Sequence, residues 1–455
     1  MRAQLTMPHA AVRAFALLVV PLLAGCVFFD EPELPSYEGM GYDGDDPAGR
    51  QPGLWPNLLG HTVRVLDNGV LTAMGATVTG AFENLTGGKL VVIPGPDSGD
   101  ALAAILEAAK KGKPMPADAV YGLDQPRMLR LAQSGLADPY EPLVANARLL
   151  GDLWPQPFKD KNGNWTGGFV DEDDTWYGTP TAHAMVAVVM DQRSPDLLNV
   201  TPPDFPHPIQ DLYDIRLYAD ELVVPDPVRS GRGLAFLLAT VQSFGEGGKT
   251  DYEWNDYWRD LFAGPDRDRD HESDGTLAVA PDWATAYARF NATDPSGEHA
   301  MVVGLSTHPA WEYGRDTLGN QSRFDADIDQ APKAILRPRS AWHLVEYAAI
   351  LEGTEERAAA QAFLEFTLTD AFQELLFYHA AMEPVVRFVA VDCKADLEPG
   401  CVLLRQPNVA DYIPATYDAQ KVDKNLDRWL CEWSALKAGD EAAFEACSAP
   451  PKKKA

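Results

Sequence analysis

Cysteine and positively charged residues are both scarce in this chain of 455 residues. Lysine and arginine together number 38, against 67 aspartates and glutamates, which gives a formal net charge of −29. Proteins that bind nucleic acid need clustered lysine and arginine to neutralise phosphates. The acidic balance therefore argues against a nucleic-acid partner and favours an exported, acidic protein that receives cations.

Short catalytic motifs are missing as well. The sequence has no GxSxG nucleophile elbow and no HExxH metal motif, and its histidines are scattered. Ser306 and His308 stand two residues apart on a segment expected to be extended, so their side chains would share one face. No acid can be assigned as the third member of a catalytic set. A lipoprotein hydrolase is kept as the alternative of a different class, and no cofactor or metal is expected.

The N-terminus has the pattern of a secretion signal. Arginines flank the apolar run "AFALLVVPLL", which is too short to span a bilayer. The following "LAGC" resembles the lipobox of bacterial lipoproteins, which implies cleavage of residues 1–25 and a diacylglycerol on Cys26; an ordinary signal peptide is the alternative. Residues 26–60 are acidic and rich in proline and glycine, so we expect a flexible tether. The lipid would hold the protein at the periplasmic or extracellular face of a membrane.

The remaining cysteines predict disulfides. They are even in number and lie near the C-terminus, in front of a basic tail at 449–455: Cys393, Cys401, Cys431 and Cys447. In an oxidising compartment the simplest pairing joins neighbours along the chain, although four cysteines allow three pairings. A zinc site is less favoured because there is no CxxC pair and no histidine at ligand spacing.

Strand-like and helical runs alternate from residue 61 onward, which favours βαβ units and an α/β fold. Strands are expected at 62–66, 89–94, 117–123, 178–191 and 299–307, and helices at 71–85, 99–112, 125–135, 340–353, 355–368 and 370–380. Residues 222–245 are expected to form a strand, a glycine-rich turn and then a helix. Extended runs that pass between two such groups describe a hinged clamshell, with each lobe a mainly parallel sheet flanked by helices. Lobe 1 is expected at 61–175 plus 301–380, and lobe 2 at 176–300 plus 381–448.

Ligands of such sheets bind at the carboxyl ends of strands, in the turns that lead into helices. The turn "RSGRG" at 229–233 is either an anion site at a helix N-terminus or a tight turn capped by Ser230, and it lacks the GK[ST] of a P-loop. Asp97 and Asp124 follow strands and are either N-caps or ligand-binding carboxylates. Trp283, Tyr287 and Trp311 could enclose a cation or a flat ring, or simply pack in the core.

The ordered set of motifs "ADAVYGLDQPRMLRLAQSGLADPY", "VPDPVRSGRGLAFLL", "PDWATAYARF" and "STHPAWEY" resembles the thiamine-binding solute receptors of bacterial ABC importers, from about residue 61 to about residue 436. The resemblance implies a two-lobed type II periplasmic-binding-protein fold. It also implies a monomer that binds thiamine or a thiamine phosphate between its lobes and delivers it to a membrane permease and its ATPase.

The resemblance also transfers site residues by position. The family's phosphate-contacting serine falls on Ser230, which Gly231 follows, and its pocket tryptophan falls on Trp283. Its acid–glycine pair falls near Asp97 to Gly99. The family's tyrosine in the same motif as this tryptophan is retained as Tyr287. The family's next motif, a ligand-contacting loop, falls on the following residues: Leu305, Ser306, Thr307, His308 and Trp311.

Several family aromatics are replaced in this chain. Leu305 stands where the family has a tyrosine, His183 lies in a stretch where it has an acid and two aromatics, and Ala381 replaces a tryptophan. A receptor of the same fold for another small cationic or phosphorylated solute is therefore the alternative. Ferric-ion receptors share the fold, but the sequence has no pair of adjacent tyrosines.

Overall fold

The computed structural model divides into two units, residues 1–41 and 42–455. The parts of the chain that it describes all belong to the second unit and comprise residues 58–95, 97–143, 176–191, 215–246, 251–264, 276–290, 299–308, 333–335, 342–380, 382–386 and 419–449. The expected signal peptide, the anchor at Cys26, most of the tether, Cys393, Cys401, Trp311 and Ala381 lie outside these ranges.

A ten-stranded mixed sheet forms the framework, with strand order β2-β1-β3-β10-β5-β8-β6-β7; β4 pairs with β10, and β9 pairs with β5. The two ends of this order are parallel, whereas β10 and β5 in the middle are antiparallel to their neighbours. The strands are β1 (Thr62–Asp67), β2 (Lys89–Pro94), β3 (Ala119–Asp124), β4 (Ala137–Asp138), β5 (Thr179–Met190), β6 (Leu222–Pro225), β7 (Ala278–Ala280), β8 (Met301–Leu305), β9 (Lys333–Ile335) and β10 (His343–Leu351).

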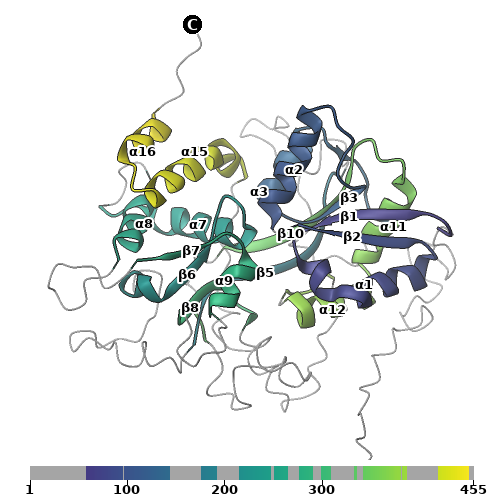
Figure 1. Ribbon diagram of the computed structural model, residues 1–455, viewed down its shortest axis with the longest axis horizontal. Helices are drawn as coiled ribbons and strands as arrows, with labels where there is room; N and C mark the ends of the chain where they lie inside the picture. The colour runs from purple at the N-terminus through teal and green to yellow at the C-terminus, as the bar shows by residue number, and fades with distance from the viewer. Residues whose placement is uncertain are drawn as a thin grey trace, which may run out of the picture. The chain divides into compact units, whose positions relative to one another are not determined.

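Helices cover both faces of the parallel group β2-β1-β3 (Figure 1). One layer contains α1 (Val70–Thr86), α11 (Arg357–Thr367) and α12 (Asp370–Ala380), and the other contains α2 (Ser98–Lys110) and α3 (Gln125–Gln133). The side chains of β1 alternate between the two cores, since Val63 and Val65 pack with the first layer and Leu66 with the second. The predicted α/β class is therefore confirmed.

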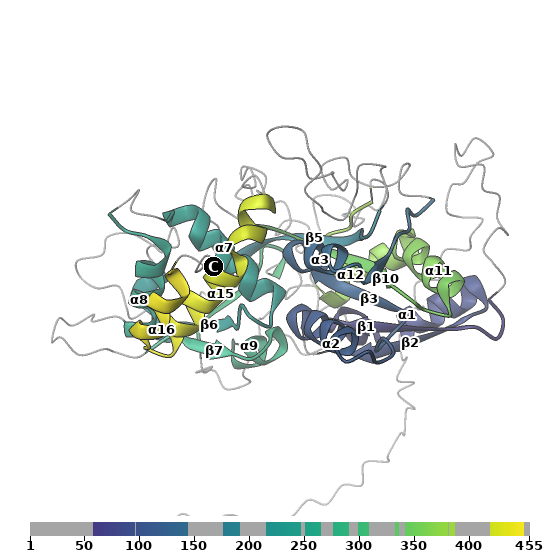
Figure 2. The ribbon, with the colours of Figure 1, turned by 90° about the horizontal axis from the view of Figure 1, so that it is seen from above.

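The parallel group β8-β6-β7 is covered in the same way. Helix α7 (Gly231–Phe244) packs on one face with α8 (Trp254–Ala263) beside it, and α9 (Trp283–Phe290) packs on the other. The C-terminal helix α15 (Ala419–Lys437) lies against α8 and also contacts α3 (Figure 2). A short 3-10 helix at Arg216–Glu221 contacts α8. Among the described helices, none is both long and apolar enough to cross a membrane.

The prediction of a helix at 340–353 is wrong, because residues His343–Leu351 of this segment form strand β10. From Leu344 to Leu351 every residue is buried, and successive side chains enter the two different cores of the sheet. A strand buried on both faces has a continuous apolar sequence, and periodicity cannot distinguish it from a buried helix. The error matters for the site, because β10 pairs with both β3 and β5.

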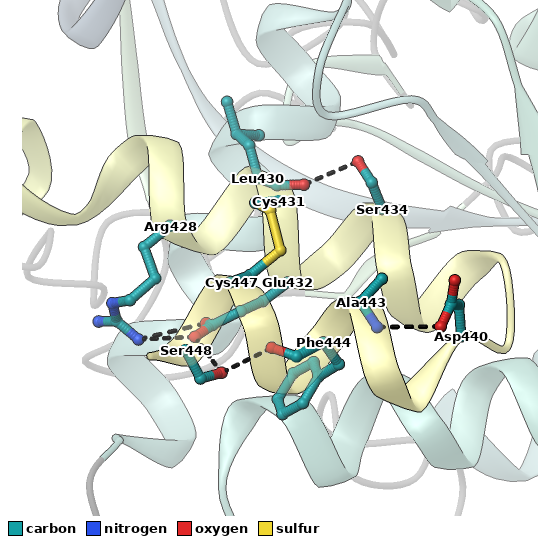
Figure 3. The surroundings of a disulfide bond; sticks show 10 residues. All are labelled: Arg428, Leu430, Cys431, Glu432, Ser434, Asp440, Ala443, Phe444, Cys447 and Ser448. Atoms are coloured by element: carbon teal, nitrogen blue, oxygen red, sulfur yellow. Dashed lines mark hydrogen bonds and ion pairs between the residues drawn. A yellow bond between two sulfur atoms is a disulfide. The ribbon is translucent and has the colours of Figure 1, made fainter. Parts of the chain in front are cut away.

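A disulfide joins the last two described helices (Figure 3). Cys431 lies in α15 and Cys447 in α16 (Glu441–Ser448), so the bond closes a segment of 16 residues. This is one of the two pairs expected from neighbouring cysteines. Helix α16 has no buried side chain. Its attachment therefore depends on the disulfide, on the partly buried Phe444, which packs against the core, and on polar contacts such as the bond from Ser448 Oγ to Glu432 at 2.7 Å.

Replacing both Cys431 and Cys447 by serine should release α16 without unfolding the sheet. Closing a loop of this length stabilises by about 3 kcal/mol, which corresponds to about a hundredfold in local protection. Hydrogen exchange read by mass spectrometry should show fast exchange at 441–448 and unchanged exchange in β1 and β3. The variant Glu445→Ala, which changes an exposed side chain of α16 and keeps the disulfide, is the control. Unchanged protection of α16 in the double variant would contradict this account.

Candidate functional site

Aspartates stand at the carboxyl ends of β1 and β3 and just after β2, where each begins a helix. Asp67 accepts hydrogen bonds from the backbone of Leu71 at 3.0 Å and of Thr72 at 2.8 Å. Asp97 is the N-cap of α2, and Asp124 is the N-cap of α3. The capping role that the sequence allowed for Asp97 and Asp124 is therefore the one seen. The carboxyl ends of parallel strands meet at one edge, so these acids gather there.

Asp97 also connects α2 to two other helices. Its Oδ1 accepts from Ser98 N at 2.8 Å and from Gly231 N at 3.1 Å, and its Oδ2 accepts from Trp283 N at 3.4 Å. The positive ends of α2, α7 and α9 thus share one carboxylate, which is only 5 % exposed. Burial raises the pKa of Asp97, and hydrogen bonds from Ser230, Gly231 and Ser98 oppose that rise.

The turn between β6 and α7 lies directly against α2. Gly99 N donates to Arg229 O at 2.7 Å, and a Cβ at Gly99 would stand 2.5 Å from Val228 O. A residue with a side chain therefore cannot replace Gly99 unless the turn shifts. Arg229 forms an ion pair with Asp100 at 2.9 Å. The predicted site residues Asp97, Gly99, Ser230 and Gly231 are thus neighbours in the structure.

Arg127 holds the same turn from α3. Its guanidinium donates to Pro227 O at 3.0 Å and to Val228 O at 2.9 Å, and it forms a buried ion pair with Asp124. Ser98 Oγ donates to Asp124 at 2.9 Å. The charges of Arg127 and Asp124 therefore neutralise each other inside the structure.

Aromatic rings gather next to Asp97. His308 stacks on Trp283 with ring centres 4.7 Å apart and an angle of 13°, and Tyr287 lies 5.4 Å from Trp283. The guanidinium of Arg232 stands 4.6 Å from the centre of the Trp283 ring. Trp283 and Tyr287 are half-buried, so part of this aromatic surface stays accessible. The sequence prediction that these residues share one region agrees with this geometry, except for Trp311, whose position the structure does not describe.

The loop after β8 is buried. Leu305, Ser306, Thr307 and His308 are each at most 7 % exposed. Leu305 N donates to His308 Nδ1 at 3.0 Å, so Nδ1 carries no proton in this arrangement. Ser306 Oγ has no hydrogen-bond partner among the residues the structure describes. A hydrolase would need a hydrogen bond between this serine and a base, and the geometry does not provide one.

His183, which occupies a family position for an acid or an aromatic, contacts a second histidine. Its Nδ1 lies 3.0 Å from His343 Nε2, and its Nε2 lies 3.1 Å from Pro384 O. Backbone hydrogen bonds in both directions connect His183 with Glu383. The described residues contain no group of three or more His, Cys, Asp or Glu side chains that could hold a metal ion.

Two charged residues near the aromatic group are not among the predicted site residues, although the sequence places Arg232 in the turn "RSGRG". Glu346 lies in β10, where it pairs with Asp124 of β3 and Ala182 of β5, and is 4 % exposed. Arg232, in the first turn of α7, is 8 % exposed. Glu346 was missed because β10 was expected to be a helix. The signal for it was a single acid inside the otherwise apolar run "HLVEYAAIL".

Electrostatics connect these residues. Burial raises the pKa of Glu346 to about 7, the charge of Arg232 and the side chain of Asn68 lower it, and the charges of Asp97 and Asp67 raise it further. Burial likewise lowers the pKa of Arg232, and Glu346 and Asp97 oppose that change. Arg127 is already paired with Asp124, so Arg232 is the remaining buried guanidinium among the described residues, and it lies in the field of two buried carboxyl groups, Glu346 and Asp97.

Comparisons with known protein families and solved structures all point to solute-binding proteins with the same fold. The family model described as "Bacterial extracellular solute-binding protein" matches residues 68–374, which is more than half of the chain. A "Periplasmic thiamin binding protein" is similar in structure, with a TM-score of 0.59 and 19 % identity over 83 % of this chain and 96 % of that one.

Two further solved structures are similar at low sequence identity. The periplasmic binding protein AfuA from Actinobacillus pleuropneumoniae, with fructose-6-phosphate bound, has a TM-score of 0.58 and 16 % identity, covering 83 % of this chain and 99 % of that one. Iron-bound HitA from Pseudomonas aeruginosa has a TM-score of 0.53 and 17 % identity, covering 84 % and 99 %. No protein of curated function matches the sequence. The predicted two-lobed periplasmic-binding-protein fold is confirmed, and at these identities the likeness extends to the fold alone.

Replacing Asp97 by alanine should lower the free energy of unfolding by about 3 kcal/mol, because backbone donors of α2, α7 and α9 lose their buried acceptor. The variant Asp97→Asn keeps one acceptor oxygen and should lose about half as much. Urea denaturation followed by circular dichroism measures both changes. Asp100→Ala, which breaks only the partly exposed pair with Arg229, is the matched control and should cost under about 1 kcal/mol. Equal midpoints for Asp97→Ala and Asp100→Ala would show that Asp97 does not hold the three helices together.

Proposed function

The chain belongs to the family of bacterial extracellular solute-binding proteins, and from that membership we propose that it is the receptor of an ABC importer for a small organic cation of the thiamine type. Proteins of this family bind a small ligand outside the cytoplasm and deliver it to an ABC permease. The membership supports a binding protein rather than an enzyme.

One observation carries the choice of a cation. Asp67, Asp97 and Glu346 are all buried, and the charges of Arg232, Asp97 and Asp67 all act on the pKa of Glu346. Half-buried aromatic rings at Trp283 and Tyr287 lie beside them. Aromatic faces and an excess of negative charge are the two features that recognise organic cations and flat, positively charged rings.

The turn at Ser230 supports an unphosphorylated ligand over a phosphate ester. Its Gly231 N–H donates to Asp97, so a carboxylate of the protein already occupies the donor that a ligand phosphate would use. A phosphate placed there would meet Asp97 and would have to displace it. Ser230 and Gly231 are in this proposal structural parts of the site wall, and the ring-binding surface comes from Trp283 and Tyr287.

The other residues assigned from the family motifs complete the proposal. Asp124 positions α3, while Leu305, Ser306, Thr307 and His308 form the buried wall beside Trp283. Trp311 is assigned to the same wall by sequence. The ligand binds between the lobes at 61–175 plus 301–380 and 176–300 plus 381–448. A monomer held through a lipid on Cys26, with the second disulfide between Cys393 and Cys401, delivers it to the permease.

The alternatives find less support. The iron-bound neighbour HitA raises the possibility of a metal ligand, but this sequence has no adjacent tyrosines, and the described residues contain no metal-binding cluster. The sugar-phosphate-bound neighbour AfuA suggests an anionic ligand, which the charge around Glu346 disfavours. A hydrolase would require Ser306 to contact a base, and its Oγ has no partner in the described part of the chain.

Thermal-shift measurements should show stabilisation by thiamine or a related organic cation, and little by thiamine monophosphate, fructose 6-phosphate or ferric ion. A micromolar ligand at a hundredfold excess over its Kd stabilises by about 2.7 kcal/mol, a shift that is easily measured. Trp283→Ala should abolish the shift, whereas Phe444→Ala, on the distant α16, should keep it. A clear shift with the phosphate esters and none with any organic cation would overturn the proposed ligand class.

A further inference from the structure

We propose that Glu346 and Arg232 form a paired hydrogen-bonding site for the ligand, in which the carboxylate accepts from an N–H donor of the cationic ligand and the guanidinium donates to an acceptor atom next to that donor. The proposal rests on the proposed function, because it names the groups that hold the ligand of that receptor. Neither residue belongs to the positions assigned from the family motifs.

Both residues present an unused polar atom. Glu346 Oε2 and Arg232 Nε have no hydrogen-bond partner among the described residues, although both side chains are more than nine-tenths buried. A buried polar atom without a partner is costly and uncommon in folded proteins. Glu346 and Arg232 are close enough to influence each other's pKa. An acceptor and a donor that both lack a partner at such a short separation indicate a binding site for a ligand.

The two unused atoms belong to the aromatic region already described. Arg232 lies over Trp283 with its guanidinium 4.6 Å from the ring centre. Glu346 stands in β10 opposite the last residue of β3, at the edge where Asp67 and Asp97 also lie. A flat molecule that rests against the exposed part of Trp283 would therefore find its polar edge directed toward this pair.

The pair selects ligands by chemistry as well as by charge. Glu346 in its ionised form only accepts hydrogen bonds, and Arg232 only donates them. The matching ligand has a donor on a positively charged or electron-poor nitrogen and an acceptor beside it, as in an amino-substituted nitrogen heterocycle. The aminopyrimidine ring of thiamine has this arrangement. A quaternary ammonium of similar size lacks the donor and would leave both protein atoms unpaired.

Several groups surround Glu346 and set its charge. They are Arg232 from α7, Asn68 and Asp67 at the end of β1, Asp97 at the start of α2, and Tyr121 in β3, whose own pKa is raised by burial and by the charge of Glu346. Burial raises the pKa of the carboxyl to about 7; Arg232 and Asn68 oppose this rise, and the charges of Asp97 and Asp67 add to it. A cationic ligand favours the ionised form, so binding lowers that pKa. By linkage, affinity should rise with pH, by about tenfold between pH 6 and pH 8.

The test is isothermal titration calorimetry of the protein with thiamine at pH 6, 7 and 8. Wild type should bind about tenfold more tightly at pH 8 than at pH 6. Glu346→Gln should bind about tenfold or more weakly than wild type at pH 8 and lose most of this pH dependence. The matched control is Glu365→Gln, because Glu365 is also buried but accepts from Tyr140 and Leu143, away from this region. The control should keep wild-type affinity and pH dependence.

Three further outcomes separate the possibilities. Wild-type binding with an unchanged affinity and pH profile in Glu346→Gln would overturn this inference and leave the proposed function intact. Absence of wild-type binding to thiamine and to other organic cations would overturn both. Should Glu346→Gln not fold, Glu346→Asp, which keeps the charge but shortens the side chain, should bind several-fold more weakly and keep the pH dependence. Full affinity in Glu346→Asp would contradict the paired geometry.

Discussion

The carboxylate of Asp97 is the interaction on which the arrangement of the site depends. It accepts hydrogen bonds at the N-termini of α2, α7 and α9, three helices that come from distant parts of the chain. Helix N-termini carry unpaired donors and partial positive charge, and they would not approach one another without an anion between them. Asp97 supplies that anion from within the protein, and the turn at Ser230 can therefore lie directly against α2.

This arrangement fixes the charge balance of everything around it. Because Asp97 satisfies the helix ends, a bound anion is not needed there, and the pair of Arg127 and Asp124 is neutral by itself. Among the described residues, Arg232 is then the remaining buried cation, and the charges of Glu346 and Asp97 act on it. The proposed preference for a positive ligand therefore depends on the same interaction that holds the helices together.

The local features of this site could be predicted from the sequence, but the strand β10 at its centre could not. The alternation of strands and helices, the caps at Asp97 and Asp124, and the neighbourhood of Trp283 and Tyr287 depend on short-range patterns or on ordered motifs. Strand β10 is buried on both faces, and its apolar run has no period that excludes a helix. Glu346 was hidden by that ambiguity. Asp97 and Gly231, which are in contact, are separated by 134 positions in the sequence, and a local sequence pattern cannot predict a contact over such a separation.

Glu346 Oε2 and Arg232 Nε, which have no hydrogen-bond partner in the part of the chain that the structure describes, connect stability with specificity. A folded protein that keeps a buried acceptor and a buried donor unpaired is less stable than one that satisfies them. A ligand that supplies both partners recovers that free energy on binding, whereas an analogue that lacks one of them leaves a desolvated group unpaired and is rejected strongly. Apolar walls discriminate weakly between molecules of similar size, so replaced aromatics such as Leu305 need not determine the ligand. On the proposal made here for Glu346 and Arg232, the polar pair on β10 and α7 is the stronger determinant.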